Sequence, residues 1–102
     1  MKSVSIRSLA KTAGLASGAD AVYLFGSRAT GRNRSDSDYD LALLLPDGCD
    51  QLQATRDAQR SLWPRPVPID LVPITKKSWE DGSNAFIREV RETGKLLFSR
   101  DG

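Results

Sequence analysis

Histidine is absent from this sequence of 102 residues, and cysteine and methionine occur once each. The lack of histidine excludes a serine–histidine–aspartate triad and histidine-based zinc sites. The lone Cys49 excludes an internal disulfide. Catalysis would therefore have to use carboxylates, basic side chains, hydroxyls or hard metal ions.

Long hydrophobic runs are also missing. No stretch approaches the length that a membrane span needs, and the N-terminus carries Lys2 and Arg7 without the apolar core of a signal peptide. We therefore expect no membrane association and a cytoplasmic location. The length suits one domain, which we take as 1–102.

Charge is nearly balanced, with 15 basic and 13 acidic residues and a formal net charge of +2. This excess is too small to indicate direct nucleic-acid binding. The local distribution is more informative, because a group of arginines comes just before a group of aspartates. These residues are Arg28, Arg32, Arg34, Asp36, Asp38, Asp40 and Asp47.

The hydrophobic pattern predicts alternating helices and strands. Helical spacing is found in 4–16, between Asp50 and Trp63, from Thr75 through Glu80, and from an N-cap at Ser83 to Gly94. Gly14 and Gly18 bracket the expected end of the first helix. Short apolar runs predict strands at 21–25, 38–45, 67–74 and 95–98, with a helical turn at 27–30 and a polar loop at 31–37.

This order predicts an α/β (α+β) fold in which helices pack on a sheet of three to four strands. Pro68 and Pro73 make 67–74 an imperfect strand, so we expect it either at an edge or paired only near its middle. Tyr39, Trp63 and Trp79 are expected to pack in the interior.

Asp38 and Asp40 are two residues apart on a predicted strand, so their side chains point to the same face. Two such carboxylates repel each other unless a cation lies between them. Oxygen ligands without histidine or thiolate suit Mg²⁺ or Mn²⁺. A pair of such ions would favour phosphoryl or nucleotidyl transfer. Alternatively, the Asp-x-Asp is only a turn feature at a strand entrance.

Gly26 and Ser27 follow a buried strand directly. A junction of strand, glycine and helix presents free backbone N–H groups that can bind an anion, and the Ser27 hydroxyl adds a donor. Arg28, Arg32 and Arg34 can then neutralise a triphosphate. By themselves, these residues equally fit a strand-ending turn followed by a solvated basic loop.

Asp70 lies in the middle of a predicted apolar strand, where a carboxylate is costly without a partner. Beside Asp38 and Asp40 it would complete a three-carboxylate metal site, or accept a proton from a hydroxyl. It can equally be an edge-strand aspartate with an ordinary polar partner.

Taken together, these residues form one specific pattern. Leu24-Phe25-Gly26-Ser27-Arg28-Ala29-Thr30-Gly31, followed by Asp36-Ser37-Asp38-Tyr39-Asp40-Leu41, resembles the minimal nucleotidyltransferases of the DNA polymerase β superfamily. The segments Pro68-Ile69-Asp70-Leu71-Val72 and 86–98 are similar to the third-carboxylate strand and the closing helix and strand of that family. The resemblance covers nearly the whole chain.

The resemblance implies a mechanism and a set of site residues. Asp38 and Asp40 would bind two Mg²⁺ ions, and Asp70 would bind the catalytic one and orient the nucleophile. Gly26 and Ser27 would hold the β- and γ-phosphates of ATP, and Arg28 would contact the triphosphate. An acceptor hydroxyl would attack the α-phosphate, and pyrophosphate would leave.

These 102 residues are not expected to include an acceptor-binding lobe, so we expect a second chain to supply the acceptor or complete the cleft. Among small family members, the pattern is similar to antitoxins that form hetero-oligomeric complexes with HEPN-type toxins and transfer AMP to a toxin tyrosine. One alternative is neutralisation of the partner by binding alone. Another is a nucleotidyltransferase that modifies a small molecule such as an aminoglycoside.

Overall fold

A computed structural model describes residues 5–32, 34, 38–64 and 67–101 of the chain. Five helices and four strands occur in these ranges: α1 (Ile6–Ser17), β1 (Ala21–Phe25), α2 (Ser27–Thr30), β2 (Tyr39–Leu45), α3 (Gln51–Ser61), β3 (Ile69–Thr75), α4 (Lys76–Asp81), α5 (Ala85–Thr93) and β4 (Lys95–Ser99). The start of the predicted first helix and part of the loop 31–37, including Asp36, lie outside the described residues.

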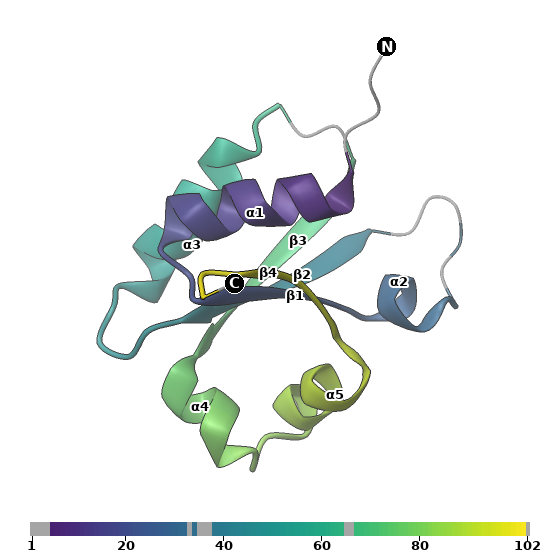
Figure 1. Ribbon diagram of the computed structural model, residues 1–102, viewed down its shortest axis with the longest axis vertical. Helices are drawn as coiled ribbons and strands as arrows, with labels where there is room; N and C mark the ends of the chain where they lie inside the picture. Colours follow the sequence, from purple (N-terminus) through teal and green to yellow (C-terminus); the bar gives the residue numbers. More distant parts are fainter. Residues whose placement is uncertain (1–4, 33, 35–37, 65–66, 102) are drawn as a thin grey trace.

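The four strands form one mixed sheet in the order β3-β2-β1-β4. β1 is antiparallel to both β2 and β4, whereas β2 and β3 run parallel. Helices α1 and α3 cover one face of the sheet, and α4 and α5 lie on the other (Figure 1). The predicted α/β sandwich is thus confirmed, with four strands.

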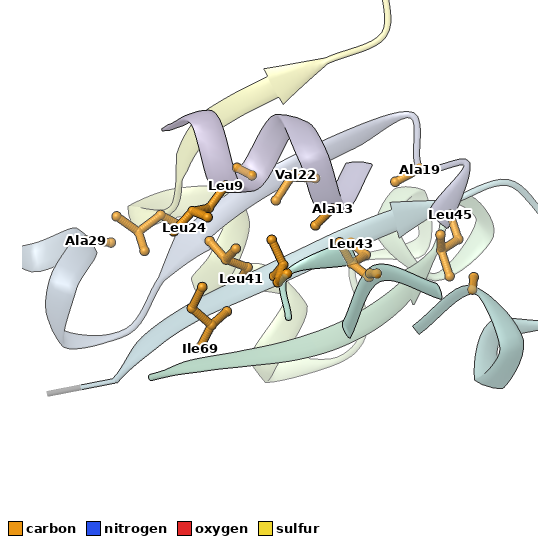
Figure 2. Packing of buried hydrophobic residues seen from close by; sticks show 14 residues of the cluster. Leu9, Ala13, Ala19, Val22, Leu24, Ala29, Leu41, Leu43, Leu45 and Ile69 are labelled. Carbon is orange, nitrogen blue, oxygen red and sulfur yellow. The ribbon is translucent and has the colours of Figure 1, made fainter. Parts of the chain in front are cut away.

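Each face of the sheet carries its own hydrophobic cluster. Leu41, Leu43 and Leu45 point from β2 toward α1 and α3 and are fully buried (Figure 2). The alternate residue Ala42 belongs to the cluster on the α4 and α5 side, as does Ile87. Because side chains alternate along a strand, Asp40 lies on the same face as Ala42.

Helix boundaries follow local capping chemistry. Asp50 and Thr75 cap α3 and α4 through their side-chain oxygens. The predicted cap at Ser83 is wrong by one residue, because the Asn84 side chain instead accepts from the backbone N–H groups of Phe86 and Ile87. An amide oxygen at the cap position satisfies two of the otherwise unpaired first N–H groups of α5.

Gly14 and Gly18 bracket the end of α1 at Ser17, as predicted. Gly18 does cap the helix in the left-handed conformation, with φ of 76°. Gly14 lies inside the helix and is buried, and a β-carbon there would collide with the ring of Phe98. Because Gly14 has no side chain, α1 can approach β4 closely at this point. The local sequence did not reveal this contact.

Strand β3 is the edge strand that its prolines predicted, but it is paired along its whole length. Its register with β2 runs from Tyr39↔Ile69 to Leu45↔Thr75 and includes Pro73 opposite Leu43. An edge strand tolerates proline where the missing N–H would face away from its neighbour. Of the two expected arrangements, the edge position is therefore the one that the strand adopts.

The two tryptophans differ in how far they are buried. Trp79 stacks on Tyr23 with ring centroids 4.7 Å apart, as expected of a packing residue. Trp63 is 74% exposed, so the prediction that it packs in the interior is wrong. It follows the last turn of α3, where helical spacing no longer determines which way a side chain points. Leu52 in α3 is also exposed, whereas Ala54, Ala58 and Leu62 are buried.

In the described part of the chain, no helix is both long enough and apolar enough to cross a membrane.

Candidate active site

Two of the predicted site carboxylates lie on neighbouring strands at the same level of the sheet. The parallel register of β2 and β3 pairs Asp40 directly with Asp70. Residues paired in this way have side chains on the same face, a strand spacing of about 4.8 Å apart. Asp38 comes two residues before Asp40, just ahead of β2, and is exposed like Asp70. Residues from two distant segments are thus brought to one end of the sheet.

The Gly26–Ser27 turn lies at the same end of the sheet, on the β1 side of Asp40. In the antiparallel register of β1 and β2, Phe25 pairs with Asp40, so Gly26 continues just past the carboxylate. A β-carbon on Gly26 would lie 2.5 Å from Oδ2 of Asp40. Glycine is therefore required here for close approach, and its φ of 78° and ψ of −157° are a conformation that other residues rarely adopt.

Ser27 opens α2, a single helical turn that starts next to Asp40. The Gly26 carbonyl accepts from the backbone N–H groups of Ala29 and Thr30 and so closes the turn. The first residue of a helix has no N–H partner within that helix, so the Ser27 N–H can donate to a ligand. The turn and the carboxylates therefore border one common site.

The environment of the three carboxylates changes the pKa of Asp40. Burial raises the pKa of the Asp40 carboxyl above its ordinary value of 3.8, and the charges of Asp70 and Asp38 raise this pKa further. Both other carboxylates therefore lie close enough to act on Asp40, and a bound cation would relieve this repulsion.

The carboxylates of Asp38, Asp40 and Asp70 do not surround a single metal position. Among the described residues, no group of three histidine, cysteine, aspartate or glutamate side chains is tight enough to hold a metal ion as it stands. The donor set nevertheless fits Mg²⁺, which is typically held by one or two carboxylates together with substrate phosphates and water. Asp38 and Asp70 are exposed, so their carboxylates have room to turn toward a metal.

Arg28 has a contact that the sequence did not reveal. Its guanidinium lies 4.3 Å from the ring centroid of Tyr39. The Tyr39 ring packs against the cluster under α1 and α3, which confirms its packing role. This cation–π contact places the Arg28 guanidinium at the start of β2, against a ring that points to the face opposite that of Asp40. Arg32 and Arg34 are exposed.

Comparison with known proteins gives the family. The family model for polymerase beta nucleotidyltransferases matches residues 8–102, so the chain belongs to this family. The resemblance inferred from the Gly-Ser and Asp-x-Asp pattern is thereby confirmed. No curated protein matches the chain.

Solved structures agree with this membership. A toxin–antitoxin crystal structure with AMP-PNP is 29% identical with a TM-score of 0.56, and a mutant of the toxin–antitoxin MntA-HpeT is 25% identical with a TM-score of 0.54. Each match covers 78% of this chain and 60% of the other, so the chain spans about 60% of their length.

A third structure supports the fold alone. It is described as a putative nucleotidyltransferase from Sulfolobus solfataricus, and it is 20% identical with a TM-score of 0.63. The match covers 93% of this chain and 81% of that chain. Both the family model and this neighbour agree with the polymerase-β-like core that the sequence predicted.

Proposed function

We propose that the chain is a single minimal nucleotidyltransferase domain that transfers AMP from ATP to a hydroxyl of a partner protein. The acceptor is a tyrosine of a HEPN-type toxin, so that the chain acts as its antitoxin. Family membership supports nucleotide transfer, and the similarity to toxin–antitoxin structures, one of them with AMP-PNP, supports the partner and the nucleotide. In this function the protein acts in the cytoplasm.

One observation carries the catalytic proposal. The strand register sets Asp40 beside Asp70, and Gly26 approaches Oδ2 of Asp40 so closely that no β-carbon would fit. A phosphate bound at the Gly26–Ser27 turn would therefore be next to the carboxylates. Phosphate-binding groups and metal ligands in one place are what nucleotidyl transfer requires.

Asp38, Asp40 and Asp70 are the proposed ligands of two Mg²⁺ ions, with Mn²⁺ as a possible substitute. When bound, the two ions would clamp the attacking and leaving oxygens and neutralise charge that develops on the phosphates. The raised pKa of Asp40 agrees with this assignment, because burial and the charges of Asp70 and Asp38 disfavour its ionised form, which a bound cation would favour. Oxygen-only donors fit a hard divalent ion.

The remaining groups bind and orient the reactants. Gly26 and Ser27 hold the β- and γ-phosphates through backbone N–H groups and the Ser27 hydroxyl. Arg28, whose guanidinium lies against the Tyr39 ring, would turn from there toward the triphosphate to contribute positive charge. The acceptor oxygen forms a bond to the α-phosphorus, and the bond between this phosphorus and the oxygen bridging to the β-phosphate breaks. Pyrophosphate leaves, and the hydroxyl proton passes to Asp70.

Label transfer from ATP tests this proposal. The chain is incubated with MgCl₂, ATP labelled at the α-phosphate, and the protein encoded by the adjacent gene. Label should appear on a tyrosine of that protein and be lost with Asp40→Asn. Asp101→Asn is the matched control, because Asp101 is exposed and distant in sequence from the site. Failure of the wild-type chain to transfer label would refute the proposed activity.

A second variant separates catalysis from neutralisation by binding. Asp38→Ala should still form a complex with the partner but no longer silence it. If Asp38→Ala silences the partner as well as the wild-type chain does, the chain acts by binding alone.

A further inference from the structure

A groove of about 270 Å³ lies on the edge of the sheet that carries Asp70. β3 lines it with Val72, Pro73, Ile74 and Thr75, and α5 lines it with Phe86 and Ile87. The neutral polar residues Ser78 and Asn84 also line it. Gln51, the first residue of α3, lines one end. The groove is thus framed by the open edge of β3 and by the helix that covers that face.

The groove is continuous with the proposed catalytic site along β3. Val72 follows Asp70 by two residues, so both side chains are on the same face, about 7 Å apart along the strand. The same face is confirmed by Ala42, which pairs with Val72 and belongs to the cluster on the α5 side. A peptide segment that lies in the groove along β3 would therefore lead toward the Asp70 carboxylate.

A second path connects the groove to the site through aromatic rings. Phe86 lines the groove and packs edge-on against Phe25, with ring centroids 5.1 Å apart. Phe25 is the residue of β1 that pairs with Asp40. The wall of the groove therefore also ends beside the carboxylates.

The chemistry of the groove limits what can occupy it. None of the described residues that line it is charged. By contrast, the groove between α1 and β4 contains Arg7 and Lys11, and the one between α4 and α5 contains Arg88 and Arg91. A polycationic aminoglycoside or a polyanionic nucleic acid would gain no charge complementarity here. The volume is also below the roughly 300–1,000 Å³ of typical small-molecule sites.

We infer that this groove docks an uncharged segment of the acceptor protein, next to the residue whose hydroxyl receives the nucleotide. The inference rests on the proposed function, and it names the class of acceptor. Apolar side chains of the segment contact Val72, Ile74 and Phe86, while the hydroxyl extends to Asp70. The groove thereby selects a polypeptide over a small charged molecule or a nucleic acid.

Two kinds of variant test the groove without touching the carboxylates or the phosphate turn. Val72→Trp fills the groove with a neutral side chain at a half-buried edge position. Gln51→Lys adds a charge at its end, and Gln59→Lys is the matched control, because Gln59 is exposed on the same helix but does not line the groove. The Gln51 and Gln59 pair keeps the test valid if Val72→Trp fails to fold.

The experiment measures label transfer to the protein encoded by the adjacent gene, its binding by calorimetry, and ATP affinity. Val72→Trp should lower kcat/KM for the acceptor at least about tenfold, and Gln51→Lys about threefold, with ATP affinity unchanged within about twofold. Gln59→Lys should match the wild type. If Val72→Trp and Gln51→Lys transfer label at the wild-type rate, the groove does not dock the acceptor. The proposed function would remain intact.

The remaining outcomes also separate the two proposals. A complex that forms without transfer, and is weakened by Val72→Trp, would refute catalysis and support the groove as the docking surface. If the wild-type chain neither binds nor labels the adjacent-gene protein, both proposals are refuted.

Discussion

Replacing Gly26 by alanine probes the closest contact of the candidate site. The new β-carbon would lie 2.5 Å from Oδ2 of Asp40. The φ of 78° and ψ of −157° at Gly26 add backbone strain of about 1–3 kcal/mol for any other residue. Because Oδ2 is the end of a side chain, the carboxylate will turn away before the backbone of β2 moves. The main effect of Gly26→Ala is therefore expected on activity.

Gly48→Ala is the matched control. Gly48 has a φ of 82° and follows the opposite end of β2, and a β-carbon added there would meet no atom within 4 Å. The substitution should cost about 1–2 kcal/mol of stability from conformation alone. For a domain of this size, 1 kcal/mol corresponds to a fall in Tm of about 4–8 °C. Label transfer by Gly48→Ala should stay close to the wild-type rate.

Urea denaturation and label transfer are measured on both variants. Gly26→Ala should lose about 1–3 kcal/mol of unfolding free energy and at least about a hundredfold in transfer rate, because a metal ligand has moved. A folded Gly26→Ala chain with activity within about threefold of the wild type would show that the approach of Gly26 to Asp40 does not matter for catalysis. Equal losses of activity in Gly48→Ala would show that the effect is not local.

Three further predictions use the same site and core. Since the folded chain raises the pKa of Asp40, it holds this proton more tightly than the unfolded chain, so stability in EDTA should fall as pH rises from below 3.8 through the raised pKa. Asp40→Asn should remove that fall in thermal melts recorded across this pH range. Mg²⁺ and ATP at about 100 times their dissociation constant should stabilise the wild type by about 2.7 kcal/mol, and Asp70→Asn should abolish most of this shift in Tm. Trp63→Ser should change the unfolding free energy by less than about 0.5 kcal/mol, because Trp63 is 74% exposed. Leu43→Ala should lower it by about 2.7–5 kcal/mol, because Leu43 is fully buried. Equal losses for the two variants in urea titrations would contradict the burial pattern.

The sequence alone determined the elements and the residue types of the site. Apolar runs and helical spacing located all four strands and the main helices to within a few residues, because each depends on contacts that repeat over two to four positions. The Gly-Ser and Asp-x-Asp spacing identified the family and named Asp38, Asp40 and Asp70 as one set. Capping was less secure, and the shift from Ser83 to Asn84 shows that two adjacent polar residues compete on nearly equal terms.

Tertiary structure decided what depends on contacts between distant segments. The pairing of Asp40 with Asp70 joins residues thirty positions apart, and the exposure of Trp63 and the burial of Gly14 against Phe98 likewise depend on which elements meet. The groove beside Val72 exists only because residues of β3 and α5, which are separate in the sequence, line it together. Local propensity cannot specify such features, since they arise from strand register and from packing between elements.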